Sequence, residues 1–273
     1  RRVLFRSVMY KLLALDLDDT LLNDKGEISE VNRKAILKAQ KKGIKIVLAS
    51  GRPTGAMTRF IEELELDKNG GYIVSFNGGE IINCETRESV FKKALTIKEI
   101  HRVYDASKKH NCSIITYRGD NIVSETMDEY IGVEVELTKM PLIQESSFKE
   151  AVDFEGVKCI VLQEPSYLKK VEKLMKDEFS DLSISISKPF FLEITAKGID
   201  KGHTIGKLAE SLNICQDEVI ACGNAENDLS MIKYAGLGVW VANTASELHK
   251  YGQDVVASNE EDGVAELIEK YLL

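Results

Sequence analysis

The chain has 273 residues, of which 44% are hydrophobic and 29% are charged, and its formal net charge is −8. This composition is typical of a globular protein, and the length indicates two domains or one large one. The acidic balance argues against nucleic acid as a partner, and no apolar run is long enough to cross a membrane.

The five cysteines form no Cys-x-x-Cys pair, which favours a reducing, cytoplasmic location over a disulfide frame or a zinc site. Residues 1–8 precede Met9 and do not fit the pattern that follows. We expect them to be non-native or disordered, and we leave them out of the fold.

The first predicted element is a strand over residues 11–15, in which the run from Leu12 to Leu15 is short and uniformly apolar, as in a strand buried on both faces. Asp16 and Asp18 then leave its carboxyl end, the edge at which ligands bind in an open α/β sheet. Two carboxylates at that edge can hold a hard cation, or can act as a nucleophile and an acid/base. They can equally begin a loop or cap a helix.

Strands and helices alternate over the first part of the chain, which predicts a parallel, doubly wound sheet. The predicted elements are a helix at 29–42 with Ser29 as N-cap, a strand at 44–49, a helix at 53–65, a strand at 72–75, the turn Asn77-Gly78-Gly79 and a strand at 80–83.

The middle of the chain, residues 84–188, reads instead as an inserted α+β module. Its predicted elements are a helix at 96–109, a hairpin of strands 112–117 and 122–124, a strand at 158–162, a helix at 166–179 and a strand at 182–187.

From residue 189 the parallel pattern returns. The predicted elements are strands at 191–195, 219–223, 237–241 and 254–257 and helices at 201–213, 228–235 and 263–272. The predicted fold is therefore a Rossmann-like α/β core over residues 9–83 and 189–273, interrupted by an α+β cap over residues 84–188.

Three later segments offer further polar groups at strand ends or helix starts. Ser50 and Gly51 follow a strand and precede a helix, where a hydroxyl and free N–H groups form an anion site or simply cap the helix. Lys201 begins a helix, the end at which the helix dipole disfavours a cation, so it is either a functional residue or an ordinary solvated lysine.

The third segment, residues 222–228, clusters oxygen donors after the strand at 219–223. Asn227 or Asp228 can be read as the N-cap of the next helix. No histidine neighbours Cys222 in sequence, so we interpret that residue as a packed core thiol.

Together these four segments resemble, in order, the four signatures of the haloacid dehalogenase-like phosphatases, beginning with Asp-x-Asp-x-Thr at residues 16–20. The turn Phe76-Asn77-Gly78-Gly79 and the tail at 258–265 resemble the Cof-type branch, in which the cap is inserted after that turn. The resemblance covers residues 9–273.

The resemblance implies a phosphatase that acts on a small phosphorylated metabolite, such as a sugar phosphate, with Mg²⁺ as cofactor. Asp16 would attack phosphorus and Asp18 would act as general acid and base. Asp16, the carbonyl of Asp18, Asn224 and, through water or Lys201, Asp228 would serve the metal site. The phosphoryl oxygens would be held by Leu17 N–H, Ser50, Gly51 N–H, Lys201 and Asn227.

Three departures from the family pattern stand out. Asp19 replaces the usual glycine, Asn224 replaces the usual aspartate, and Trp240-Val241-Ala242-Asn243 replaces a smaller, glycine-containing pattern. An amide at residue 224 removes one negative charge from the metal site, which could weaken metal affinity or mark a degenerate enzyme.

Three alternatives remain at this point. A phosphomutase would use the same nucleophile, a binding protein would hold phosphate and metal without turnover, and a response-regulator receiver would be about half this length with its acidic pair on another strand. The oligomeric state and the metabolite cannot be read from the sequence, although the cap should select the metabolite.

Overall fold

The computed structural model describes residues 9–273, which form two compact units. The first unit contains residues 9–51, 59–90 and 200–273, and the second contains residues 52–58 and 91–199. The prediction made for residues 1–8 lies outside the described residues.

An eight-stranded sheet forms the centre of the first unit, with the order β14-β13-β12-β1-β2-β3-β4-β5. Neighbouring strands are parallel from β14 to β3, and β4 is antiparallel to β3. The strands are β1 (Leu12–Leu15), β2 (Lys45–Ala49), β3 (Tyr72–Ser75), β4 (Glu80–Asn83), β5 (Ser89–Lys92), β12 (Val219–Gly223), β13 (Leu237–Val241) and β14 (Asp254–Val256). This parallel core confirms the predicted fold class.

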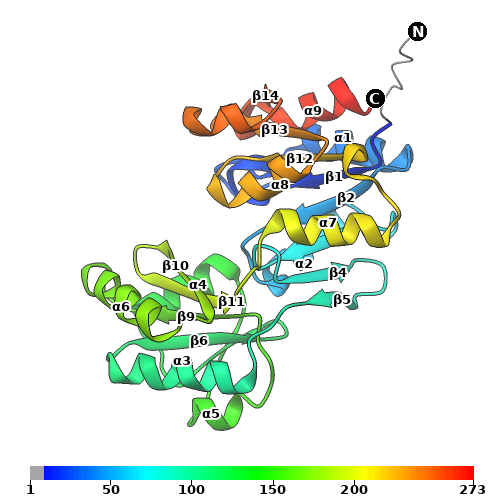
Figure 1. Ribbon diagram of the computed structural model, residues 1–273. Helices are drawn as coiled ribbons and strands as arrows, with labels where there is room; N and C mark the ends of the chain where they lie inside the picture. The colour runs from blue at the N-terminus through cyan, green and yellow to red at the C-terminus, as the bar shows by residue number, and fades with distance from the viewer. Residues whose placement is uncertain (1–8) are drawn as a thin grey trace. The chain divides into compact units, whose positions relative to one another are not determined.

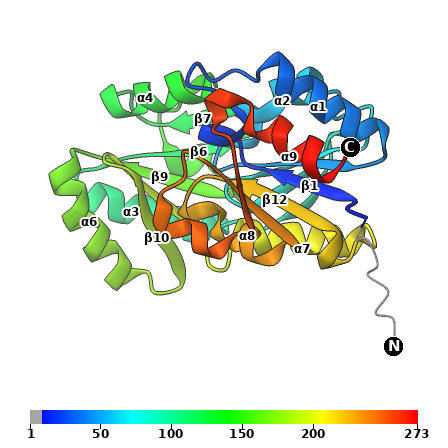
Figure 2. The same ribbon diagram turned by 90° about the horizontal axis from the view of Figure 1, so that it is seen from above.

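Helices cover both faces of this sheet. Figure 2 shows α1, α2 and α9 on one side of β1 and β12, and α7 and α8 on the other. The bounds are α1 (Glu30–Lys41), α2 (Thr58–Glu63), α7 (Lys201–Ser211), α8 (Leu229–Tyr234) and α9 (Gly263–Tyr271). All four residues of β1 are fully buried, as expected for a strand covered on both faces.

The direction of winding reverses at β1. The chain passes from β1 to β2 and β3 on one side, and β12, β13 and β14 lie on the other. In open parallel sheets the connections diverge at such a point and leave a crevice at the carboxyl ends of the strands. The winding reverses here between β1 and β12, so the crevice, and with it a ligand, is expected at the carboxyl ends of these two strands.

A six-stranded sheet of order β10-β11-β9-β6-β7-β8 forms the second unit. Its strands are β6 (Ser113–Arg118), β7 (Asn121–Ser124), β8 (Leu142–Gln144), β9 (Lys158–Leu162), β10 (Leu182–Lys188) and β11 (Phe191–Ala196), and its helices are α3 (Ile97–Lys109), α4 (Glu129–Thr138), α5 (Phe148–Ala151) and α6 (Pro165–Glu178). Figure 1 shows α3 and α6 beside this sheet.

The hydrophobic core of the second unit lies on one face of its sheet. It joins Ile100 and Val103 of α3 and Leu168 and Val171 of α6 to alternate residues of the strands, such as Val161 of β9. Since side chains alternate along a strand, the intervening residues project to the opposite face. That face carries the polar cluster described below.

The structure places the boundaries between the units at 90/91 and 199/200, not at the predicted 83/84 and 188/189. Residues 191–195 do form a strand, but β11 pairs antiparallel with β9 and β10 in the second sheet, not with the parallel core. The sequence shows that a segment is a strand but not which strand it pairs with. Elements β5, β8, α4 and α5 were not predicted.

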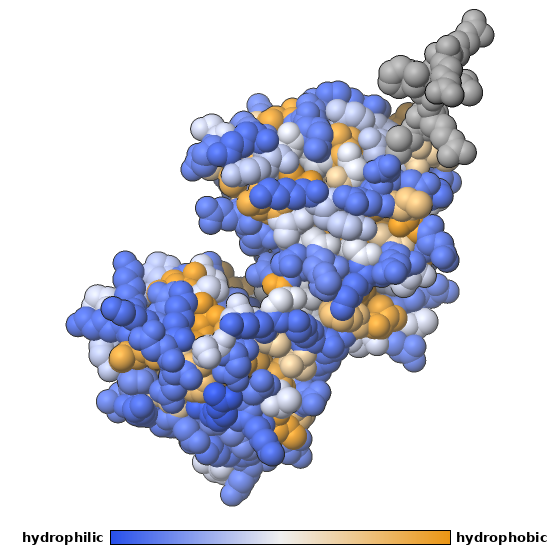
Figure 3. Space-filling view, viewed as in Figure 1, coloured by the Kyte–Doolittle hydropathy of each residue, from blue (hydrophilic) through white to orange (hydrophobic). Residues whose placement is uncertain are grey.

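Hydrophilic residues cover most of the face visible in Figure 3. Within residues 9–273, no helix combines the length and the apolar character that crossing a membrane requires.

Candidate active site

The first predicted site residue, Asp16, lies directly beyond the carboxyl end of β1. Its N–H donates to the carbonyl of Cys222 at 2.9 Å, which continues the pairing of β1 with β12. Asp16 is 4% exposed, and its Oδ2 accepts a hydrogen bond from Thr20 Oγ1 at 3.0 Å. The carboxylate is therefore fixed at the crevice between the two strands.

After Asp16 the chain makes a tight turn over Leu17–Leu21, closed by a hydrogen bond from Leu22 N–H to the carbonyl of Leu17 at 2.9 Å, with non-helical backbone angles at Asp18 and Asp19. Leu17 is buried, whereas Asp18 is exposed. Asp19 has a φ of 57°, in the left-handed region that favours glycine but that aspartate tolerates. This backbone explains why the aspartate at residue 19 can replace the family's glycine.

Lys201 lies between two carboxylates. Its Nζ is 2.6 Å from Asp16 Oδ1 and 2.6 Å from Asp228 Oδ1, and the Lys201 side chain is 0% exposed. The structure thus rejects the reading of Lys201 as a solvated surface lysine. It brings together residues from three segments that are far apart in the sequence.

The start of α7 is held close to α8, which fixes the lysine. Asp200 caps α7 by accepting from His203 N–H at 2.8 Å. A Cβ on Gly202 would lie 2.2 Å from the carbonyl oxygen of Ser230, so only glycine permits this contact. Gly202 N–H also donates to Ser230 Oγ at 3.0 Å. The first turn of α7 therefore has little freedom to move.

Burial and the neighbouring charges both shift the pKa values of Asp16 and Lys201. Burial, aided by the nearby Asp228, raises the pKa of Asp16 to about 7, although Lys201 opposes the shift. Burial disfavours the charged form of Lys201, but Asp16 and Asp228 outweigh it and raise the lysine's pKa. Lys201 therefore stays protonated. When Asp16 and Asp228 are both ionised, the three side chains together carry a net charge of one negative unit.

One carboxylate oxygen of Asp228 accepts from Lys201, and the other accepts from backbone N–H groups. Its Oδ2 accepts from the N–H of Asn224 at 2.9 Å and of Ala225 at 3.1 Å. Asp228 stands at the N-cap position of α8, as one reading of the sequence has it, but its side chain makes no capping hydrogen bond to that helix and binds the backbone that precedes it instead. Asn224 is half-buried and Asn227 is exposed.

The loop after β2 carries Ser50 and Gly51. Ser50 is 1% exposed, its N–H donates to the carbonyl of Val74 at 2.9 Å, and its carbonyl accepts from Asn77 N–H at 2.9 Å. Asn77 Oδ1 in turn accepts from Asn227 Nδ2 at 3.2 Å. These bonds connect the Ser50 loop to the loop that carries Asn227.

Sequence reasoning missed three residues that shape this region. Thr20 and Asn77 lay inside quoted motifs without an assigned role. Asn243 lay in a segment noted only as a departure from the family pattern. Its Nδ2 donates to the carbonyl of Asp19 at 2.7 Å, and its Oδ1 accepts from Asn259 N–H at 3.1 Å. Asn243 therefore holds the turn that follows the two aspartates.

Cys222, at the end of β12, is fully buried. Burial raises the pKa of its thiol, so the reactive thiolate is disfavoured. This agrees with its interpretation as a core residue.

The donor set at the crevice fits a hard divalent cation. The buried carboxylates of Asp16 and Asp228 face a single ammonium, which leaves negative charge for a cation to offset. Among residues 9–273 no three His, Cys, Asp or Glu side chains group as a metal site, so amide or backbone oxygens would have to complete the set. The amide of Asn224 and the carbonyl of Asp18 are such oxygens.

The second unit contains a polar cluster of its own. Lys158 is 4% exposed and its Nζ lies 2.9 Å from Glu193 Oε1. Tyr117 Oη donates to Glu134 Oε1 of α4 at 2.6 Å, and the Lys158 ammonium lies 5.7 Å from the centre of the Tyr117 ring. Burial raises the pKa of Glu134. We call Tyr117, Glu134, Lys158 and Glu193 the second-unit cluster.

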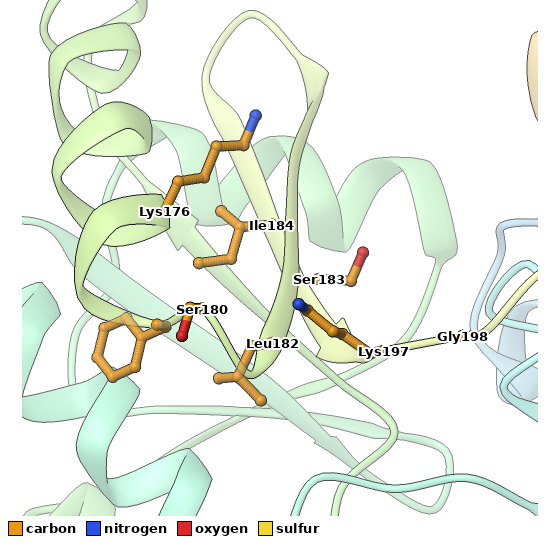
Figure 4. A pocket seen from close by; sticks show the side chains of 8 residues that line it. Lys176, Ser180, Leu182, Ser183, Ile184, Lys197 and Gly198 are labelled. Atoms are coloured by element: carbon orange, nitrogen blue, oxygen red, sulfur yellow. The ribbon is translucent and has the colours of Figure 1, made fainter.

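A pocket of about 470 Å³ also lies in the second unit. Figure 4 shows its lining side chains around the end of α6 and strand β10, with Lys176 and Lys197 among them. Lys176 is paired with Glu172 at 2.7 Å. None of the predicted site residues lines this pocket.

Comparison with known proteins identifies relatives over nearly the whole chain. Residues 13–268 match the family model described as haloacid dehalogenase-like hydrolase. A crystal structure of a haloacid dehalogenase-like hydrolase from Bacteroides thetaiotaomicron is 39% identical, with a TM-score of 0.92 over 96% of this chain and 99% of the other.

Two further relatives extend this likeness. TM0651 from Thermotoga maritima is 26% identical, with a TM-score of 0.88 over 96% of this chain and 97% of the other. The 5-amino-6-(5-phospho-D-ribitylamino)uracil phosphatase YcsE of Bacillus subtilis is 31% identical over 96% of this chain and 96% of its own length.

Proposed function

Because this chain belongs to the haloacid dehalogenase-like hydrolase family and is a phosphatase, we propose that it hydrolyses a small phosphorylated metabolite through an aspartyl phosphate on Asp16, with Mg²⁺ as cofactor. The observation that carries this proposal is the buried Lys201, whose ammonium bridges Asp16 and Asp228 at 2.6 Å each. A carboxylate nucleophile repels a phosphate dianion, so cationic groups must offset that repulsion.

In the first step a carboxylate oxygen of Asp16 attacks phosphorus, and the bond from phosphorus to the ester oxygen breaks. The leaving oxygen takes a proton from Asp18, whose exposed side chain lies two residues beyond the nucleophile. In the second step Asp18 accepts a proton from water, which attacks phosphorus and breaks its bond to Asp16. Inorganic phosphate leaves, and both aspartates return to their starting states.

The remaining predicted residues bind and orient the phosphoryl group. Lys201 would pair with one phosphoryl oxygen, and Ser50, Asn227 and the N–H groups of Leu17 and Gly51 would hold the others. Such fixed donors stabilise phosphoryl transfer because they need no rearrangement as charge moves.

Oxygens of Asp16, Asp18 and Asn224 would hold Mg²⁺, and Asp228 would support that set through the backbone it binds. When bound, the cation would neutralise charge on the carboxylate and on the phosphoryl oxygens. Because Asn224 is neutral, the site has one formal charge fewer than with the aspartate usual in the family.

The test is a screen for inorganic phosphate release from a panel of phosphorylated metabolites, with Mg²⁺ and with EDTA. The panel includes sugar phosphates and 5-amino-6-(5-phospho-D-ribitylamino)uracil, the compound in the name of the YcsE relative. The control is Asp16→Asn, which keeps the shape of the side chain but cannot attack phosphorus. We expect release that needs Mg²⁺ and falls by at least about a thousand-fold in the control.

Three outcomes would contradict the proposal. If the Asp16→Asn variant kept more than about a tenth of the wild-type rate of phosphate release, Asp16 would be excluded as the nucleophile. A wild type that binds phosphate and metal but releases nothing would be the degenerate, non-catalytic protein. Transfer of phosphate between positions of a sugar without its release would identify a phosphomutase.

A further inference from the structure

The turn between β3 and β4 has an unusual backbone. Three consecutive residues have positive φ values, 53° at Phe76, 56° at Asn77 and 105° at Gly78. Such values cost energy for residues other than glycine, with asparagine among the most tolerant. A strained turn is retained when its surroundings require that shape, so its contacts need an explanation.

The backbone of this turn is attached to two of the site segments. Asn77 N–H donates to the carbonyl of Ser50 at 2.9 Å. On the other side, Thr204 Oγ1 of α7 donates to the carbonyl of Gly78 at 2.8 Å. A Cβ on Gly78 would lie 2.5 Å from the carbonyl oxygen of Asp200, the cap of the helix that begins at Lys201.

The side chain of Asn77 contacts Asn227 and the backbone of Gly51. Its Oδ1 accepts from Asn227 Nδ2 at 3.2 Å. A Cβ on Gly51 would lie 3.0 Å from its Nδ2, so the Asn77 amide packs directly against the Gly51 backbone. Asn77 thus touches both the segment whose N–H groups are proposed to hold phosphate and the exposed side chain proposed to do the same.

We propose that Asn77 is a positioning residue that holds Asn227 and the Gly51 backbone in the arrangement that binds the phosphoryl group. The proposal rests on the proposed function only through the roles given to Asn227 and Gly51. Asn227 is exposed, so without Asn77 its side chain would sample other rotamers and would lose entropy on binding phosphate. A group fixed beforehand binds more tightly because that loss has already occurred.

A purely conformational role for Asn77 makes a different prediction. If only its tolerance of positive φ matters, glycine should replace it at no cost to binding. The variant Asn77→Gly therefore separates the two roles, since it keeps the backbone freedom and removes the amide. Asn213→Gly is the matched control, because Asn213 has the same φ of 56° beyond the end of α7 and is exposed.

The experiment measures the Kd of inorganic phosphate in the presence of Mg²⁺, by calorimetry and by the shift in melting temperature, together with KM and kcat for one phosphate monoester. We expect Asn77→Gly to raise Kd and KM by about ten-fold, with kcat changed by less than about three-fold, since the lost interaction acts on bound phosphate throughout. Asn213→Gly should bind phosphate as the wild type does.

The double variant then tests whether Asn77 acts through Asn227. In an Asn227→Ala background, Asn77→Gly should raise Kd by clearly less than it does in the wild type, because one of the two groups that Asn77 positions is gone while the Gly51 backbone remains. A full effect of Asn77→Gly in that background would overturn the proposal. So would an Asn77→Gly variant that binds phosphate like Asn213→Gly.

Failure of the proposed function gives a different result. A wild type that binds inorganic phosphate, with the dependence on Asn77 described, but that hydrolyses no monoester would refute turnover and leave the positioning role intact. A folded wild type that binds no inorganic phosphate would overturn the positioning role, and melting curves of every variant establish that it is folded.

Discussion

Lys201 in the first unit and Lys158 in the second unit are both buried lysines paired with carboxylates, yet they have different surroundings. Lys201 lies at the start of a helix, beside the carboxyl ends of β1 and β12, and contacts Asp16 and Asp228. Lys158 lies on β9, which pairs antiparallel with both of its neighbours β6 and β11, and it contacts Glu193 of β11.

The two clusters also differ in what surrounds the carboxylates. Asp228 also accepts from two backbone N–H groups of a loop, and Asp16 is followed by a tight turn. In the second-unit cluster the acceptors are side chains on the strands and on α4, and Glu134 is bound by a tyrosine hydroxyl. The difference teaches that buried lysine–carboxylate pairs occur in two quite different settings in this chain. The Lys201 cluster is distinguished by its position at the ends of strands, beside loops that carry exposed polar side chains such as Asp18 and Asn227.

Replacement of Lys201 should have the largest effect on the reaction. We expect Lys201→Met to raise the barrier to phosphate release by about 2–4 kcal/mol, or about 30- to 1,000-fold in rate, because a preorganised charge on the phosphoryl group is lost. The measurement is kcat/KM on the folded fraction, with folding checked by circular dichroism. A rate near that of the wild type would show that Lys201 does not act in the reaction, and Lys201 and Lys158 would then not differ in function.

Lys158→Met is the matched variant in the second unit. It leaves Glu193 and Glu134 without the ammonium, so we expect the free energy of unfolding to fall by about 2–4 kcal/mol. Thermal and urea melts measure this change. If the folded variant lost turnover as strongly as Lys201→Met, the second-unit cluster would also act on the reaction and the comparison would fail.

Asn224→Asp sharpens the comparison by adding charge to the first cluster alone. The affinity of a hard-cation site rises with the charge of its ligands, so the Mg²⁺ concentration for half-maximal rate should fall by about three- to ten-fold. The maximal rate could fall as well, because an added carboxylate repels the substrate dianion. The measurement is a magnesium titration of the rate for the wild type and for Asn224→Asp. An unchanged Mg²⁺ concentration for half-maximal rate would show that residue 224 is not a ligand of the metal.

The smallest expected effect concerns Glu134 in the second-unit cluster. Burial raises its pKa in the folded state, so the folded protein binds more protons and its stability falls as pH rises from the ordinary carboxyl pKa through the raised one. Glu134→Gln lacks this ionisation. Its stability relative to the wild type should therefore increase from pH 4 to pH 8. Equal differences at both pH values in thermal melts would contradict this.

The amino-acid sequence by itself determined the local character of this protein. The apolar run before Asp16, the alternation of strands and helices, and polar groups at several strand ends or helix starts were sufficient to predict a parallel α/β core and its crevice. These features depend on short-range patterns, and the structure confirms the parallel core. The sequence singled out Asp16, Lys201 and Asp228 because each follows a strand or begins a helix, and the structure brings these three side chains together.

The tertiary structure alone decided which segments meet. Strand β11 pairs with β9 in the second sheet, which the sequence did not predict because the residues of an apolar strand do not specify the strand with which it pairs. The side chain of Asp228 bound a loop and a lysine instead of making a capping hydrogen bond to α8, and Asn77 met Asn227 across 150 positions of sequence. Hydrogen bonds between distant loops depend on where the whole sheet places its connections, and no local pattern of residues encodes that placement.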